Sequence, residues 1–150
     1  MFEVRSRVAG RSLAVSDVPD PVFAKGLVGP GLAIMPRPGH QRAVAPVEGT
    51  LVKVHPHAYV VLTESGHGVL VHLGIDTVHL HGDGFRLHAA EHNRVRSGDT
   101  VVSWDPTHIE GTGRAPTCAV VVLDCDPEIL RLHAVDSEVE VNQLLFEVDC

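Results

Sequence analysis

Two histidines stand where they could act together on one reacting group. His72 lies inside the apolar run Gly68–Leu73, and His57 comes shortly before the apolar run Tyr59–Thr63. Near neutral pH an imidazole is largely uncharged, so it can serve as a nitrogen nucleophile or as a hydrogen-bond donor. A lone ring of this kind can simply be satisfied in the core or at a sheet edge. Two such rings on neighbouring strands favour a shared chemical task.

The segment between the two runs predicts how the histidines meet. Ser65-Gly66 is a turn signal, so the runs should fold back on each other as a β-hairpin. With a two-residue loop, His57 and His72 become diagonal neighbours, roughly 7–8 Å apart at the backbone. Alternation along the strands then gives a core face of Ala58, Val60, Leu62, Val69, Val71 and Leu73, and an opposite face of His57, Tyr59, Val61, Leu70, His72 and Gly74. A three-residue loop would reverse this parity.

Strand-like runs recur along the whole chain. Fourteen glycines and ten prolines among 150 residues predict short strands joined by tight turns. We therefore expect an all-β fold, an antiparallel β-sandwich or barrel with minimal short helices. One helical turn is expected to begin at Asp126-Pro127, and a second short helix within residues 85–92. The predicted strands are Ser12–Val15, Leu32–Met35, Gln41–Ala45, Thr50–Val54, Tyr59–Thr63, Gly68–Leu73, Thr100–Trp104, Cys118–Leu123 and Leu144–Val148.

Composition and charge exclude several classes of protein. The formal net charge of −7 and the lack of a basic block argue against nucleic-acid binding. The opening residues 1–5 lack the apolar stretch of a signal peptide, and no run has the length of a transmembrane helix, so membrane insertion is not expected. The three cysteines, Cys118, Cys125 and Cys150, form no C-x-x-C motif, and at least one cannot pair. This usage is typical of reduced thiols in a cytoplasmic protein.

Several segments resemble, in order, the glucose-type enzyme IIA of the bacterial phosphoenolpyruvate:sugar phosphotransferase system. Around the histidines these are HAY at residues 57–59, VHLGIDTV at 71–78 and GDGF at 82–85. Further matches are DVPDPVFA at 17–24, VAPVEGT at 44–50, GDTV at 98–101 and TCAVVV at 117–122.

The resemblance runs from about Val8 to Val148 and has consequences for the fold. It implies a short N-terminal segment at residues 1–7, followed by a single enzyme IIA domain over residues 8–150. It also implies the duplicated hybrid motif. Residues 8–10 (VAG) and 47–49 (VEG) are weakly similar, and each lies in a small-residue turn before a strand. This similarity agrees with that duplication.

The resemblance also implies a function, that of a phosphoryl carrier, and so a phosphotransferase of sugar uptake. His72 would be the phosphorylated nucleophile, and His57 would stabilise the phosphoryl group. The implied donor is the phosphocarrier protein HPr, and the implied acceptor is a cysteine on the IIB domain of a membrane sugar permease. Glucose, N-acetylglucosamine and β-glucosides are equally compatible with such a domain, and regulated enzymes or permeases would be additional partners. No organic cofactor is implied.

A docking rim around the histidines follows from the same resemblance. The matching positions are mostly apolar, which suits a transient interface that excludes water from the transferred group. Two acids at its edge, Asp20 and Asp76, would influence the orientation of the partner or the phosphate. The complete predicted rim is Asp20, Val22, Phe23, Val28, Tyr59, Leu70, Asp76 and Val78.

One departure from the family concerns the residue two places before the assisting histidine. The family often carries a threonine there, and this chain has His55. The hydroxyl that could orient the His57 ring is therefore absent. His55 could take over the orientation of the His57 ring or could simply point to solvent. Because Pro56 restricts the backbone between the two histidines, we expect His55 to point to solvent.

Two alternative functions are open, and the eleven histidines raise the first of them. His55-Pro56-His57 and His79-Leu80-His81 have the alternating spacing of zinc ligands on strands, and zinc peptidases with a related hybrid-motif fold exist. A zinc-dependent hydrolase is thus one alternative, although no carboxylate completes either pair. A purely regulatory binding module is the other. For the carrier itself we expect no required metal and at most an incidental zinc at His57 and His72.

Overall fold

The computed structural model describes residues 2–25 and 28–149. In these ranges the chain forms three antiparallel sheets with only short helical pieces, so the predicted fold class is confirmed. The strands are β1 (Phe2–Arg5), β2 (Gly10–Ala14), β3 (Gly31–Pro36), β4 (Gln41–Val44), β5 (Gly49–His55), β6 (Ala58–Leu62), β7 (Gly68–Leu73), β8 (Phe85–Leu87), β9 (Arg94–Val95), β10 (Thr100–Trp104), β11 (Cys118–Val122), β12 (Leu130–Leu132), β13 (Glu138–Val139) and β14 (Leu144–Val148).

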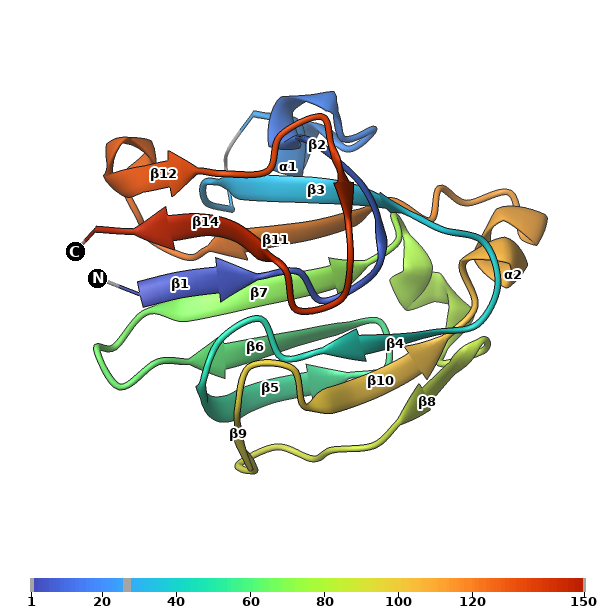
Figure 1. The fold of residues 1–150 in the computed structure, drawn as a ribbon. Coiled ribbons are helices and arrows are strands. Elements are labelled where there is room, and N and C mark those ends of the chain that lie inside the picture. Colours follow the sequence, from blue (N-terminus) through green and yellow to red (C-terminus); the bar gives the residue numbers. More distant parts are fainter. Residues whose placement is uncertain (1, 26–27, 150) are drawn as a thin grey trace.

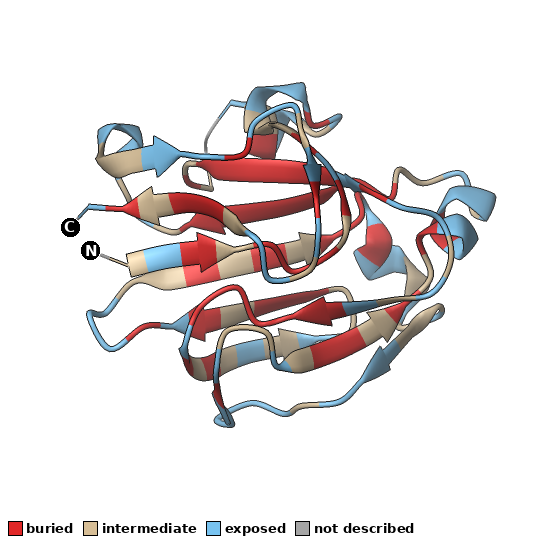
Figure 2. Cartoon of the chain, viewed as in Figure 1, coloured by how far each residue is buried: buried red, intermediate tan, exposed pale blue. Residues whose placement is uncertain are grey.

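The sheets are arranged in two layers. One layer is an eight-stranded sheet of order β13-β2-β3-β11-β7-β6-β5-β9. Two three-stranded sheets, β1-β14-β12 and β4-β10-β8, lie over one of its faces (Figure 1). The main core fills the space between the layers and includes Trp104, Phe146 and Tyr59, none of which is exposed. Figure 2 shows that the buried segments follow the strands of both layers, whereas the connecting loops are mostly exposed.

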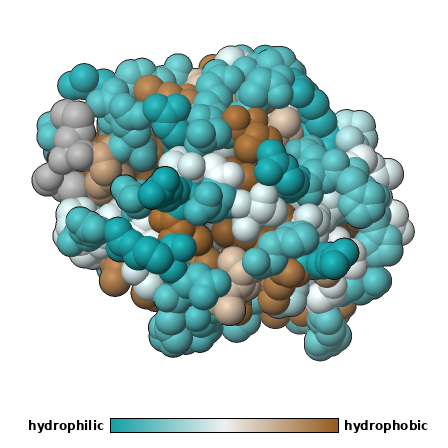
Figure 3. Space-filling view, turned by 60° about the horizontal axis from the view of Figure 1, so that its bottom comes forward, coloured by the Kyte–Doolittle hydropathy of each residue, from teal (hydrophilic) through white to brown (hydrophobic). Residues whose placement is uncertain are grey.

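The opposite face of the eight-stranded sheet carries a second, smaller apolar cluster. Its buried members are Val18, Phe23, Ala33, Ile75, Ala119 and Val121. The 3₁₀ turn η1 (Val15–Asp17) and helix α1 (Pro21–Ala24) lie beside this cluster and cover part of it. The central strand β11 is therefore buried on both faces. Elsewhere the surface is mixed, as in the face of Figure 3, where hydrophobic patches alternate with hydrophilic residues.

Three of the short helical pieces in the described residues share one sequence signal, an Asp-Pro dipeptide. In α1, in α2 (Pro106–Gly111) and in the 3₁₀ turn η3 (Pro127–Ile129), Pro occupies the first turn and the preceding Asp accepts a hydrogen bond from the backbone N–H two residues on. This is N-capping combined with a favourable Pro position. The prediction at Asp126-Pro127 is confirmed. The helix predicted within residues 85–92 is wrong, because residues 85–87 form β8 and pair with β10.

The beginning of the chain also differs from the sequence prediction. Residues 1–7 were expected to precede the domain, but Phe2–Arg5 form β1, which pairs with β14 at the other end of the chain. Val4 is fully buried. Residues 2–7 therefore belong to the folded unit, and the ends of the described chain lie side by side (Figure 1). Residues 1 and 150, to which the predicted domain limits extend, lie outside the described residues.

The hairpin between β6 and β7 has a three-residue loop rather than the predicted two-residue loop. Thr63 N–H donates to the His67 carbonyl at 2.9 Å, which leaves residues 64–66 as the loop. Gly66 takes φ +87°, a conformation that glycine adopts without strain. Ala58 therefore pairs with His72, and Tyr59 pairs with Val71. The parity predicted for β6 is wrong: Tyr59 and Val61 face the main core, whereas Ala58, Val60 and Leu62 share the face of His72.

Candidate functional site

His72 lies near the end of β7, between two alanines. Its partners across the sheet are Ala58 on β6 and Ala119 on β11. Both neighbours are small, so the imidazole is not crowded within its own sheet. The ring stands on the face of the smaller apolar cluster, and the ring of Phe23 from α1 meets it in a T-shaped arrangement with 5.5 Å between ring centroids. Residues far apart in the sequence thus form a half-buried, apolar setting for one imidazole.

A backbone hydrogen bond fixes the tautomer of His72. Its Nδ1 lies 2.6 Å from the carbonyl oxygen of Gly74. Because a carbonyl can only accept, Nδ1 carries the proton and donates it. Nε2 is then left with its lone pair. The same geometry explains the glycine: Gly74 has φ +79°, and a Cβ there would lie 2.6 Å from the Cγ2 of Thr77.

The segment after Gly74 is held by a second hydrogen bond. The Thr77 hydroxyl, which is buried, donates to the carbonyl of Leu73 at 2.7 Å. Asp76 then adopts a left-handed conformation with φ 59° and begins the 3₁₀ turn η2 (Thr77–Leu80). This turn presents Val78 to solvent. The VHLGIDTV motif therefore builds both the tautomer lock and part of the surface beside the histidine.

His57 belongs to the tight turn that joins β5 to β6. His55 and Ala58 close this turn as a pair, so Pro56 and His57 are its two central residues. The His57 carbonyl accepts from the N–H of Leu73 at 2.7 Å, which ties the turn to the end of β7. The His57 and His72 rings meet edge to face, with centroids 5.2 Å apart and an interplanar angle of 70°. The predicted pairing of the two histidines is therefore present, although the register that produces it differs.

Both rings are kept neutral by their surroundings. Burial is the largest cause that lowers the pKa of His72, opposed by the hydrogen bond to Gly74 and by the charges of Asp20 and Asp76. Burial also lowers the pKa of His57, to about 4, with smaller effects from His72 and His55. A neutral imidazole retains the lone pair that a nucleophile needs. At physiological pH the site therefore offers an unprotonated Nε2 on His72.

The predicted docking rim is only partly at the surface. Val22 and Val78 are 46% and 51% exposed, respectively, and Val28 and Leu70 are half-buried beside the smaller cluster. Phe23 is buried and its ring forms a T-shaped pair with that of His72. Asp20 caps α1 by accepting from the N–H of Val22 at 2.9 Å, and the Asp76 side chain is exposed.

Tyr59 is the exception, and its assignment to the rim is wrong. Its side chain is fully buried in the main core, and its hydroxyl donates to the carbonyl of Val44 at 2.7 Å. The three-residue loop places Tyr59 opposite Val71 on the inner face of the sheet. It therefore supports the strand that leads to the site and does not contact a docking partner.

Replacing Tyr59 with phenylalanine is expected to lower the free energy of unfolding by about 1–3 kcal/mol, because the buried carbonyl of Val44 loses a hydrogen-bond donor. Phosphoryl acceptance by the folded protein should be unchanged. Urea unfolding measures the first effect. If Tyr59→Phe lost phosphoryl acceptance without losing stability, Tyr59 would have a direct role in function.

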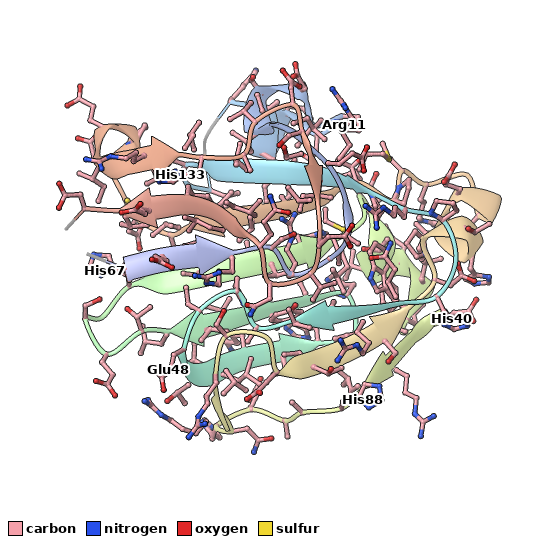
Figure 4. The ribbon with its side chains drawn as sticks, in the orientation of Figure 1. Arg11, His40, Glu48, His67, His88 and His133 are labelled. Carbon is pink, nitrogen blue, oxygen red and sulfur yellow. The ribbon has the colours of Figure 1, made fainter. Side chains whose placement is uncertain are left out.

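The structure does not support a metal centre in the described part of the chain. No group of three or more His, Cys, Asp or Glu residues there is arranged to hold a metal ion. Among the additional histidines, His67 and His133 lie toward one end of the molecule and His40 and His88 toward the other (Figure 4). The zinc-hydrolase alternative is therefore not favoured. Within the same ranges no helix is long and apolar enough to span a membrane.

Sequence reasoning missed two features of the site. Helix α1, which brings Phe23 to His72, was not predicted, although Asp20-Pro21 is its start signal. The second feature is a contact between the rings of His55 and His57, whose centroids are 5.8 Å apart with an interplanar angle of 24°. His55 is exposed, but its ring lies nearly parallel to that of His57 and does not simply point to solvent, as had been expected.

Comparisons with known proteins agree with the family resemblance of the sequence. Residues 2–127 match the family described as "phosphoenolpyruvate-dependent sugar phosphotransferase system, EIIA 1". The chain is 35% identical over 142 residues to the PTS system glucose-specific EIIBCA component of Corynebacterium glutamicum, covering 92% of this chain but 21% of that protein. It is 40% identical over 119 residues to the PTS system glucose-specific EIIA component of Halalkalibacterium halodurans, covering 78% and 68%.

A solved structure extends the agreement to the fold. Glucose permease IIA from Mycoplasma capricolum superposes with a TM-score of 0.88 and 28% identity, covering 97% of this chain and 94% of that one. The sequence match spans most of the chain, and the structural match includes both layers. The chain therefore belongs to the EIIA 1 family of the phosphoenolpyruvate-dependent sugar phosphotransferase system.

Proposed function

We propose that this protein carries a phosphoryl group on Nε2 of His72 during sugar uptake. The observation that supports this most directly is the hydrogen bond from Nδ1 of His72 to the Gly74 carbonyl, which leaves Nε2 with its lone pair. The lowered pKa of His72 keeps that lone pair available. A neutral nitrogen nucleophile with a fixed tautomer suits phosphoryl transfer, since positioning dominates that chemistry.

The cycle consists of two exchanges. In the first, the Nε2 lone pair attacks the phosphorus of a phosphohistidine on the donor. A P–N bond to His72 forms while the P–N bond of the donor breaks, and the donor imidazole keeps the electron pair of the broken bond. In the second, an acceptor thiolate attacks, and a P–S bond forms as the bond to Nε2 breaks. The proton on Nδ1 stays in place throughout. Its hydrogen bond to Gly74 favours the positive charge that develops on the phosphorylated ring.

His57 is assigned the supporting role. Its ring meets the His72 ring edge to face at 5.2 Å, close enough for an N–H to reach an oxygen of a phosphoryl group on Nε2. The arriving group brings about two negative charges. These charges oppose the effect of burial on the pKa of His57 and favour a donating or protonated His57 in the phosphorylated state.

The partners are proposed as phosphorylated HPr for the donor and the IIB domain of a membrane sugar permease for the acceptor. Relatives such as the Corynebacterium protein carry the matching segment within a longer chain whose name includes B and C components. A fused arrangement of that kind implies that transfer occurs between adjacent domains. We place the exchange in the cytoplasm, where the sugar is received after transport.

We further propose that the transfer needs no metal or organic cofactor. The two imidazoles would supply only two of the four ligands that zinc ordinarily takes. An incidental zinc at His57 and His72 would need its remaining ligands from another molecule or from water.

A pH titration provides one test of the site. His57 should titrate near pH 4, and His72 below 6.5, when their ring signals are followed by NMR. Phosphoryl acceptance should therefore stay constant as the pH falls from about 8 to about 6.5 and decline only below it. Because an unfolded chain would bind the His57 proton first, the free energy of unfolding should fall as the pH drops from about 6.5 toward 4. A His72 pKa above 7 would contradict the proposed resting state.

The complete function is tested by reconstitution. Phosphoenolpyruvate, enzyme I and HPr are mixed with this protein, and an acid-labile, base-stable phosphate on the chain is measured. IIB domains of candidate permeases are then added to follow the transfer onward. Omitting HPr is the control, because labelling that persists without it would place the donor elsewhere.

A further inference from the structure

The backbone of His57 is firmly held, but its ring is not held by hydrogen bonds. Pro56 restricts the turn, and the N–H of Leu73 donates to the His57 carbonyl at 2.7 Å. Within the described residues, no hydrogen bond to either ring nitrogen of His57 is present. A half-buried imidazole on a two-residue turn can rotate about its χ angles unless packing restrains it. Contacts with neighbouring rings therefore set the direction of the His57 N–H.

The His57 ring has an aromatic contact with each of two other histidines. His72 meets it edge to face at 5.2 Å, and His55 lies nearly parallel to it at 5.8 Å. His55 ends β5 and pairs with Ala58, so the rings of His55 and His57 both belong to the turn between β5 and β6. Because aromatic pairs at such distances attract each other beyond their simple burial, the His55 ring restricts rotation of His57 away from His72.

We propose that His55 is a positioning residue, whose ring stacks on His57 and keeps the His57 N–H directed toward the phosphoryl group on His72. The inference rests on the proposed function for its consequence in transfer, whereas the stacking can be tested without it. The role depends on a flat ring and not on the nitrogens of His55. His55 does not contact the reacting atoms, so its effect must pass through His57.

The first experiment uses the unphosphorylated protein and NMR. The pKa and ring signals of His57 are compared in the parent, His55→Ala and His55→Phe, with His79→Ala as a matched control at another exposed histidine. Removing the stacked ring should expose His57 and move its pKa from about 4 toward its ordinary value of 6.5. Phenylalanine should keep the pKa low, and His79→Ala should leave it unchanged. An unchanged His57 pKa in His55→Ala would overturn the proposal.

The second experiment measures transfer from phosphorylated HPr and onward to a IIB domain. His55→Ala should slow the exchange that depends on His57 by about threefold to tenfold, the range expected for one aromatic contact. His55→Phe should stay within about twofold of the parent. In a His57→Ala background, His55→Ala should add nothing, because residues that act through one another are not additive.

The outcomes separate this proposal from the function on which it rests. A parent protein that accepts no phosphate refutes the carrier function, while the NMR comparison still decides whether His55 positions His57. A parent that transfers normally, with His55→Ala within twofold of it, refutes the positioning role alone. Equal losses from His55→Ala in the parent and in the His57→Ala background would show that His55 acts independently of His57.

Discussion

Replacing His72 with alanine is expected to abolish phosphoryl acceptance from HPr. The nucleophilic atom is removed. Among the described histidines, no other ring donates from Nδ1 to the Gly74 carbonyl, and so none can replace His72 beside the smaller apolar cluster. The fold should persist, because His72 lies between two alanines and is not fully buried. The measurement is the amount of acid-labile, base-stable phosphate on the protein after incubation with phosphorylated HPr.

Two controls accompany the His72 variant. His40→Ala removes an exposed histidine near the far end of the molecule from His67 and His133 (Figure 4) and should label fully. Thermal unfolding of His72→Ala should resemble that of the parent, which separates loss of the nucleophile from loss of the fold. Full labelling of His72→Ala would mean that another residue carries the phosphate.

Replacing Val78 with lysine is expected to weaken HPr binding by about tenfold or more, equivalent to 1.4 kcal/mol. Val78 is 51% exposed on η2, directly after the segment that fixes His72. A lysine there would remove apolar contact and would place a charged ammonium group in an interface that excludes water. Calorimetric titration of unphosphorylated HPr measures the effect, and Val22→Lys on α1 should act in the same direction.

The control for the docking surface is a lysine at another exposed apolar residue, in the other layer. Leu87 is 42% exposed on β8, in the sheet β4-β10-β8. Leu87→Lys changes charge and hydropathy in the same way and should bind HPr as the parent does. Phe23→Lys is a poorer test, because Phe23 is only 6% exposed and its replacement would also unpack α1. Equal affinities for Val78→Lys and Leu87→Lys would place the docking face elsewhere.

The sequence by itself determined the class of the fold and marked the candidate residues of the site. One polar ring in the apolar run 68–73 marked His72, because the alternation of β7 leaves Val69, Val71 and Leu73 on the buried face. The structure added the hydrogen bond from His72 to the carbonyl of Gly74, which fixes the tautomer. The helical turn at Asp126-Pro127 was also readable, since its capping contacts are local in sequence.

Only the tertiary structure decided how β6 is oriented. Residues 58–62 are all apolar, so hydrophobic alternation does not tell the two faces of this strand apart. Its parity depends on the loop, and the sequence ESG at residues 64–66 is compatible with loops of different length. In the structure the loop has three residues, because Thr63 pairs with His67 and Gly66 adopts a left-handed conformation. That choice turned Tyr59 inward and placed Ala58 beside His72.

The other features that only the tertiary structure shows depend on contacts between segments that are distant in the sequence or lie on paired strands. Strand β1 exists because Phe2–Arg5 pair with residues near the other end of the chain, and β8 forms because Phe85–Leu87 pair with β10. Local sequence does not encode such partners, and long-range pairing overrides weak local preference. The His55–His57 stack has the same origin, because the turn must first bring His55 opposite Ala58 before the two rings can meet. The residues of the site were thus readable from the sequence, whereas the contacts that orient them arise only when the strands are paired.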